Sequence, residues 1–263
     1  MDSWFVLPHL AAVRIEGSDA IAFAQAQFTS PFPDTGAQAW GLTAWCNPKG
    51  RVLYVIVART YESHVDLVIP IDQASELFNR LRMYAIGRKV TLHHCDHVAG
   101  ALSTSAADAA LGFDSERSLA VNKAAAAAAE PFIQAWREAD LRAGVAWLGP
   151  ASSGQYLPQA LGLEERGGLS YRKGCYPGQE IIARVHYLGK AKERLSAFIQ
   201  RDAQDTDSDE LVAADGKPVG RVLQSMSRCD TNIGLAVVSA DLAPETTVQR
   251  GRAQVTLLPP EAL

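Results

Sequence analysis

The sequence predicts an α+β fold of antiparallel sheets and helices, followed by a small β-barrel at the C-terminal end. Short runs rich in β-branched and aromatic residues, bounded by turn residues, indicate antiparallel strands. Apolar residues recur at helical spacing in a few segments between these runs. The chain has 263 residues, more than the roughly 100 to 200 of one domain. We therefore expect an α+β region over 1–195, with a second lobe near 47–103, and a barrel domain over 196–263.

A strand followed by a short helix opens the chain. Residues 9–16 have the pattern of a strand, and Ser18 or Asp19 can cap a helix over 19–28. Three hairpin-forming strands follow, over 41–46, 51–59 and 64–70, with a turn at 47–50. This region is expected to be antiparallel sheet.

The middle of the chain alternates clear and weak patterns. A helix is predicted over 72–86, ended by Gly87, and a strand over 89–95. The pattern weakens between Ala101 and Glu130, where the run 124–129 is either a surface helix or a connection. Residues 131–145 again have helical spacing. The glycine-rich segment 149–180 has neither period, so we expect a loop ordered by something else, such as a ligand.

The last third contains several short strands. An acidic spacer over 201–210 separates 195–200 from strands at 210–214, 218–226, 233–239 and 253–259. Short strands at this spacing are typical of a small closed or Greek-key barrel.

Composition limits the classes of function. The net charge of −4 gives no global attraction for a polyanion, so we expect no direct nucleic-acid partner unless a local basic patch provides one. No window approaches the roughly 18 apolar residues of a membrane span, and the N-terminus lacks the basic region of a secretory signal. We predict a cytoplasmic protein without a membrane partner. Its four cysteines form no CxxC or CxxH pair, so free thiols are expected.

The segment 173–180, KGCYPGQE, carries the densest group of reactive and hydrogen-bonding side chains. Gly174 and Gly178 permit backbone shapes that other residues avoid, and Pro177 stiffens the turn between them. A lysine close to a thiol favours the thiolate, so Lys173 can activate Cys175. These two residues are the candidate catalytic pair. The alternative is a tight turn around a buried, inert cysteine.

The residues after this loop can continue as helix or as strand. Glu180 and Arg184 share a face in a helix and one side in a strand, so they can pair in both cases.

KGCYPGQE followed by IIAR resembles the signature of the YgfZ family, whose members are relatives of the aminomethyltransferase (T-protein) of the glycine cleavage system. The resemblance extends to SGQYLPQALGLEERGGLSYR, FAQAQFTS, CNPKGRV, LRMYAIGRKVTL, VGRV and GLAVV, and so covers most of the chain.

This resemblance implies a ring of three parts around a folate site. It also implies binding of tetrahydrofolate or a one-carbon folate derivative, and a role in making or maintaining iron–sulfur proteins, including enzymes that modify transfer RNA. The implied partners are folate and iron–sulfur client or assembly proteins. The expected folate-binding residues are Tyr176, Gln179, Glu180, Arg184, Gln27, Tyr156 and Arg142.

The sequence also departs from the family pattern. Ala26, Ser30 and Pro31 stand where the family commonly has Gly, Asn and Asp. Arg142 replaces a glutamate that helps to hold the pterin in the T-protein. The pterin edge then needs another acceptor, for which Glu180 or a backbone carbonyl is a candidate, and Arg142 can attract the glutamate tail instead. A one-carbon transferase and a non-catalytic scaffold for client proteins are the alternative functions.

Further candidates have plainer explanations. Cys46, beside the 47–50 turn, can face the same cavity as Cys175, but a strand-end cysteine is more often core, and Cys95 and Cys229 are expected to be structural. His93, Cys95 and His97 of HHCDH lie on one side of a strand and can converge on a metal, but we expect no metal site. Tyr156 and Tyr171 flank the glycine-rich loop and can either stack on a pterin or pack in the core.

Overall fold

The computed structural model describes residues 3–33, 39–102, 110–201 and 208–263. A five-stranded sheet with the order β3-β4-β5-β2-β6 forms the first layer. Its strands are β2 (Leu10–Glu16), β3 (Gly41–Cys46), β4 (Val52–Thr60), β5 (His64–Pro70) and β6 (Thr91–His94). Adjacent strands run antiparallel, which confirms the predicted hairpins.

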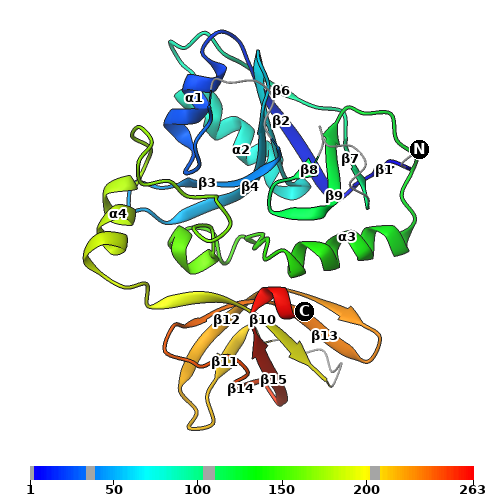
Figure 1. Ribbon diagram of the computed structural model, residues 1–263, viewed down its shortest axis with the longest axis vertical. Helices are drawn as coiled ribbons and strands as arrows, with labels where there is room; N and C mark the ends of the chain where they lie inside the picture. The colour runs from blue at the N-terminus through cyan, green and yellow to red at the C-terminus, as the bar shows by residue number, and fades with distance from the viewer. Residues whose placement is uncertain (1–2, 34–38, 103–109, 202–207) are drawn as a thin grey trace.

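Two helices cover one face of this sheet, α1 (Ala20–Gln27) and α2 (Ile71–Tyr84) (Figure 1). Side chains of β2 alternate between two cores, as the period of a strand requires. Val13 and Ile15 pack under the helices with Phe23 and Leu77, and Leu10 lies in the core on the other side. Both helices lie where the helical spacing predicted them.

A second sheet was not predicted from the sequence. Its strands, in the order β1-β7-β9-β8, are β1 (Phe5–Val6), β7 (Val98–Ala101), β9 (Asp114–Val121) and β8 (Ala110–Leu111). The charged start of β9 conceals its strand pattern, because Arg117 is buried by partners far along the chain. The surface helix considered over 124–129 is wrong, since the Val6 amide donates to the Ala126 carbonyl and holds this segment extended.

Three further helical segments follow: α3 (Glu130–Arg142), the 3-10 turn η2 (Pro158–Leu161) and α4 (Gln179–Leu188). In Figure 1, α3 lies between the sheets and the C-terminal strands. Gly144 has a φ of 66° just beyond α3, a conformation that stops a helix and suits glycine.

The C-terminal strands form a closed barrel with the order β10-β13-β12-β11-β14-β15. They are β10 (Glu193–Gln200), β11 (Glu210–Val212), β12 (Pro218–Arg228), β13 (Thr231–Ser239), β14 (Thr247–Arg250) and β15 (Ala253–Leu258), followed by the 3-10 turn η3 (Pro260–Ala262). β10 closes the barrel by pairing with both β13 and β15. Six residues of the predicted acidic spacer, 202–207, lie outside the described residues.

One apolar core joins the three sheets and the helices between them. It contains Leu42 of β3, Val98 of β7, Trp136 of α3, Leu161 of η2 and Leu235 of β13. The predicted fold class, α+β with antiparallel sheets and a C-terminal barrel, is confirmed. In the described residues, no helix has the length and apolar character to cross a membrane. The predicted domain limits stay a prediction, and the first barrel strand begins at Glu193.

Candidate functional site

The loop over 169–178, here called the cysteine loop, is fixed at its start to the segment after α1. The Ser170 amide donates to the Thr29 carbonyl over 2.9 Å. The Thr29 hydroxyl in turn donates to the Gly168 carbonyl over 2.7 Å. Two segments far apart in sequence are thereby tied together beside the predicted functional residues.

Lys173 holds the centre of this loop. Its Nζ donates to the carbonyls of Phe28 and Ser30, the latter over 2.7 Å. The same nitrogen lies 5.7 Å from the ring centre of Phe32 and 5.2 Å from that of Tyr176. Burial lowers the pKa of Lys173 to about 7, whereas carbonyl oxygens and aromatic faces favour an ammonium. Through these contacts Lys173 fixes the loop to the segment after α1. Activation of Cys175 by Lys173 stays a prediction.

Cys175 is exposed, so the tight turn around a buried cysteine is wrong. Tyr176, the next residue, is only 6% exposed, and its hydroxyl donates to the Ser170 carbonyl over 3.0 Å. Burial, and secondarily the nearby Cys46 thiol, raises the pKa of Tyr176. The loop therefore anchors a lysine and a phenol inward and presents the thiol outward.

The end of the loop packs on the turn between β3 and β4. Gly178 has a φ of 79°, and an added Cβ would come within 2.5 Å of the Gly50 Cα. Gln179, the first residue of α4, donates from Nε2 to the Lys173 carbonyl over 3.3 Å. The two motifs NPKG and KGCYPGQE thus form one packed unit.

The residues after the loop form a helix, which decides between the two predicted alternatives. Glu180 and Arg184 are both exposed on α4. No ion pair joins them among the contacts of the described chain, although their spacing permits one.

A second polar cluster joins α4 to residues 164–171. The Tyr171 hydroxyl donates to Glu164 Oε2 over 2.8 Å, and His186 Nδ1 lies 3.0 Å from Glu164 Oε1. The rings of Tyr171 and His186 stack with centres 3.9 Å apart. Burial, followed by the bond to Glu164, raises the pKa of Tyr171. Since His186 covers one face of its ring, Tyr171 is a weaker candidate for stacking on a pterin. Sequence reasoning missed Glu164, which has no distinguishing local pattern.

The other predicted binding residues lie on separate elements. Tyr156 is 7% exposed in the main core, and burial raises its pKa. Gln27 ends α1, and its Oε1 is buried with no partner among the described residues. Arg142 ends α3 and donates to Glu138 Oε1 over 2.7 Å.

A cavity of about 290 Å³ lies where α3, the five-stranded sheet and the barrel meet. Its lining residues are His9, Leu10, Pro70, Arg137, Asp140, Leu141, Trp147, Gln224, Ser225 and Met226. None of the predicted site residues lines it. The cavity is near the lower end of ligand pockets, which span roughly 300 to 1,000 Å³, and can accept a bicyclic ring rather than a whole folate.

We call this space the junction cavity. Two of its ionisable residues, His9 and Asp140, differ in their hydrogen-bond partners. Neither ring nitrogen of His9 has a partner within the described chain, and burial lowers the pKa of His9. Asp140 is 6% exposed, and its Oδ1 accepts from Arg117 over 2.7 Å while its Oδ2 accepts from Trp147 Nε1 over 2.9 Å. A ligand with ring donors and acceptors would satisfy the imidazole.

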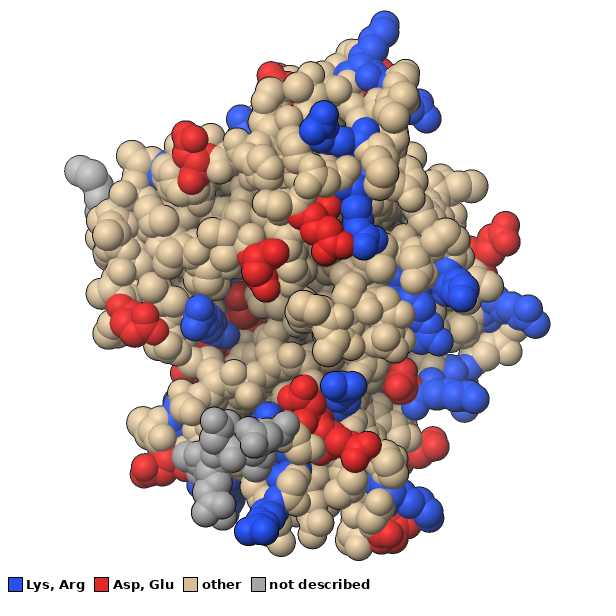
Figure 2. Space-filling view, turned by 180° about the vertical axis from the view of Figure 1, so that it is seen from behind, with Lys and Arg blue, Asp and Glu red and all other residues tan. Residues whose placement is uncertain are grey.

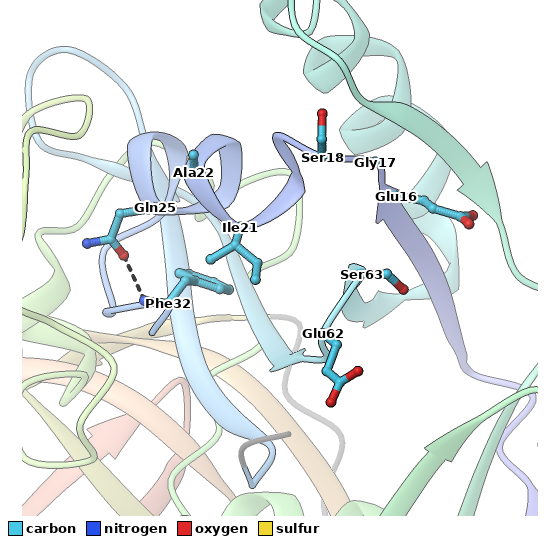
Figure 3. A pocket seen from close by; sticks show the side chains of 9 residues that line it. All are labelled: Glu16, Gly17, Ser18, Ile21, Ala22, Gln25, Phe32, Glu62 and Ser63. Carbon is cyan, nitrogen blue, oxygen red and sulfur yellow. Dashed lines mark hydrogen bonds between the residues drawn. The ribbon is translucent and has the colours of Figure 1, made fainter. Parts of the chain in front are cut away.

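A larger, open hollow of about 580 Å³ lies between the β2–α1 and β4–β5 turns (Figure 3). Glu16 and Glu62 bring carboxylates to it, and Ile21 and Phe32 bring apolar surface. Phe32 is also the residue whose ring lies near Lys173. Carboxylates in the lining disfavour a ligand with an anionic tail.

The remaining cysteines and the HHCDH segment fall into different environments. Cys46 is buried in the core, and burial raises its pKa. Cys229 is exposed at a hairpin turn with a φ of 50°. His94 stacks on Phe78, and His97 Nε2 contacts the Lys123 carbonyl. No group of three or more His, Cys, Asp or Glu side chains is placed to hold a metal in the part of the chain that the structure describes.

The fold matches a solved structure over nearly its full length. Aminomethyltransferase T of the glycine cleavage system from Bartonella henselae matches 99% of this chain and 86% of its own, with a TM-score of 0.71 and 15% identity. The chain therefore has the fold of the T-protein class.

Sequence comparisons find two relatives of this chain. The chain is 28% identical over 216 residues to an uncharacterized protein of Haemophilus influenzae, covering 79% of this chain and 77% of the relative. It is 35% identical over 118 residues to the tRNA-modifying protein YgfZ of Klebsiella pneumoniae, covering 43% of this chain and only 36% of the relative. No family model matches the chain. The chain is thus similar in sequence to YgfZ over part of its length and has the fold of the T-protein.

Proposed function

We propose that the chain is a cytoplasmic, tetrahydrofolate-binding accessory protein that supports the synthesis or repair of iron–sulfur proteins, including enzymes that modify transfer RNA. The observation that carries this proposal is the cysteine loop, in which Lys173, Tyr176 and Gln179 are engaged in internal bonds while Cys175 is exposed. A loop held so firmly around an exposed thiol suits a thiol that meets a partner.

The junction cavity is the place we assign to the pterin ring of the folate. His9 supplies two unpartnered ring nitrogens there, and Asp140 supplies carboxylate oxygens that have capacity beyond the two bonds they accept. Glu180, the acceptor expected from the sequence, is exposed on α4 and does not line the cavity. We therefore propose Asp140 in its place.

The glutamate tail of the folate needs a cation. Arg137 lines the cavity, whereas Arg142 pairs with Glu138. Since the cavity accepts the ring rather than the whole folate, the tail must extend beyond it, and the candidate cations are Arg137 of the lining and Arg142 once it leaves Glu138.

Two measurements test this proposal. Calorimetry should detect tetrahydrofolate binding, and His9→Leu should weaken it at least tenfold while His94→Leu, at an exposed position away from the cavity, should not. In cells that lack the protein, Cys175→Ser should fail to restore iron–sulfur enzyme activity, although it binds folate as the wild type does. Full complementation by Cys175→Ser would show that the exposed thiol has no role.

One observation favours a second candidate, a folate-dependent aminomethyl transferase. Such an enzyme needs an acid or a base beside the folate nitrogens, and the cavity lining includes His9 and Asp140. Formation of methylenetetrahydrofolate from an aminomethyl donor, abolished in His9→Leu, would support this candidate. A scaffold would instead retain iron–sulfur clients in a pull-down without folate.

A further inference from the structure

Positive charge is concentrated around α4. The segments 49–51 and 172–192 contain seven Lys or Arg residues and one acid, Glu180, a formal charge of +6 in a chain whose total is −4. Glu164, Glu165 and Glu193 line a hollow beside His186 and Lys190, and with these three carboxylates counted the surface around α4 still has a formal charge of +3. The two segments are adjacent, because Gly50 packs on Gly178 and on Ile182 of α4. Figure 2 shows blue side chains gathered along its right-hand edge, which is the edge that α4 occupies on the left of Figure 1.

Six of the seven cations keep hydrogen-bond donors for a ligand: Lys173 is enclosed in the cysteine loop, whereas Arg51 uses one of its donors for the Gln155 carbonyl. We call the surface that they form the α4 face; its cations are Lys49, Arg51, Arg172, Arg184, Lys190 and Lys192. All are exposed except Arg51, which is half-buried and donates to the Gln155 carbonyl. Among the ion pairs of the described residues, none involves these six side chains.

An unpaired cation cluster raises the local concentration of anions and speeds their association. Some other exposed cations of the described chain are paired with acids, as the pairs of Arg80 with Glu76 and Lys217 with Asp215 illustrate.

Aromatic and apolar side chains lie among these cations. Tyr187 of α4 is 64% exposed and meets His186 edge to face, and Leu188 is 81% exposed. An exposed aromatic ring set between cations is the arrangement on which single-stranded nucleic acids bind, with phosphates on the cations and a base on the ring.

We propose that the α4 face binds single-stranded nucleic acid, such as an unpaired loop of an RNA, through its phosphate backbone and a base stacked on Tyr187. The net charge of the whole chain gave no reason to expect such a ligand and left open only a local basic patch. The structure contains that patch. This inference is independent of the proposed folate-dependent function.

Fluorescence anisotropy tests the proposal. The probes are a labelled 20-nucleotide RNA of mixed sequence and a DNA of the same sequence. Binding is measured between 50 and 200 mM KCl, with poly-L-glutamate as a competitor. If all six cations contact phosphates, log K should fall with log [KCl] with a slope near −4, from about −0.7 per contact on a single strand. Lys49→Gln, Arg172→Gln, Lys190→Gln and Lys192→Gln combined should reduce the slope to about −1.4 and the affinity at 50 mM at least tenfold.

A matched control removes the same charge elsewhere. Arg80→Gln, Arg88→Gln, Lys217→Gln and Arg252→Gln combined lie on α2, the turn after it and the barrel turns, and should leave the slope unchanged. Tyr187→Ala should lose about tenfold in affinity with the slope retained, because stacking does not depend on salt as phosphate contacts do. The RNA and DNA arms decide whether the ribose contributes.

The proposal is overturned if the wild type does not bind the oligonucleotides at 50 mM KCl, or if both charge variants weaken binding equally. Strong binding of poly-L-glutamate without binding of RNA or DNA would also overturn it and would indicate an acidic protein partner. The same charge variants should bind tetrahydrofolate in calorimetry as the wild type does. Absence of nucleic-acid binding would therefore leave the folate proposal intact, and absence of folate binding would leave the nucleic-acid proposal intact.

Discussion

Gly178 and Gly50 are in backbone contact, and this contact positions the cysteine loop on the β3–β4 turn. A Cβ on Gly178 would lie 2.5 Å from the Gly50 Cα, and Gly178 has a φ of 79°. Gly178→Ala should therefore lower the free energy of unfolding by at least about 2 kcal/mol, from backbone strain and overlap together. Urea unfolding measures it.

Gly174→Ala is the matched control, since no heavy atom lies within 4 Å of its added Cβ and its φ is not positive. We expect a change within about 0.5 kcal/mol. Equal losses in the two variants would contradict the role of the Gly178 contact.

Lys173 stabilises the loop through two carbonyl groups, those of Phe28 and Ser30. Lys173→Met keeps most of the aliphatic stem but leaves both carbonyls without this donor, so we expect a loss of about 2 to 4 kcal/mol in urea unfolding. Arg172→Met, at the exposed neighbouring position, should change stability by less than about 0.5 kcal/mol. A Lys173→Met variant as stable as the wild type would show that these two hydrogen bonds do not contribute to stability.

Thiol exposure separates the four cysteines. Cys175 and Cys229 are exposed, Cys95 is half-buried and Cys46 is buried. Iodoacetamide should alkylate Cys175 and Cys229 first in the native protein and Cys46 only on unfolding, as peptide mass mapping over time can follow. Cys175→Ser should keep wild-type stability, because no core contact is lost. Rapid alkylation of Cys46 under native conditions would contradict the packing of the β3 end.

The outcome for these residues shows what local sequence patterns can and cannot predict. Periodicity and turn chemistry are local, so the hairpins around residues 47–50 and the helices near 72 and 131 could be predicted. Contacts between distant segments could not. The burial of Arg117, which hides β9, depends on Asp140 and Trp136 of α3. Charge summed over the chain likewise concealed the α4 face, to which the turn at 47–50 adds Lys49 and Arg51 by packing against α4.

His9 should make stability depend on pH. Burial lowers its pKa from the usual 6.5, opposed by Asp140 and Glu130 and assisted by Arg137. The unfolded chain therefore binds more protons than the folded chain as pH falls below 6.5, and the stability from the neutral buried imidazole is lost in that window. Relative to His9→Gln, wild-type stability should decline by up to about 1.4 kcal/mol per pH unit between pH 6.5 and 5.5.

Chemical unfolding at half-unit pH steps measures this difference. Parallel pH profiles for the wild type and His9→Gln would show that the imidazole titrates alike in both states. Bound tetrahydrofolate should steepen the decline if the ligand accepts or donates at a neutral imidazole.

Arg117 and Arg142 each pair with a carboxylate of α3, one in the interior and one at the surface. The Arg117 side chain is 1% exposed, bonds to Asp114 and Asp140, and lies 4.7 Å from the ring centre of Trp136. Arg117→Met leaves the Asp140 carboxylate buried with only Trp147 as a donor, so we expect a loss of about 3 to 5 kcal/mol. The Arg142 side chain is 44% exposed, and Arg142→Met should cost less than about 1 kcal/mol. Urea unfolding at pH 7 compares the two variants.

If Arg117→Met unfolds with the wild-type midpoint, Asp140 is not held by this pair, and its place in the junction cavity must have another cause. If Arg117→Met does not fold at all, Arg117→Lys, which keeps one charged donor, should restore folding with part of the stability.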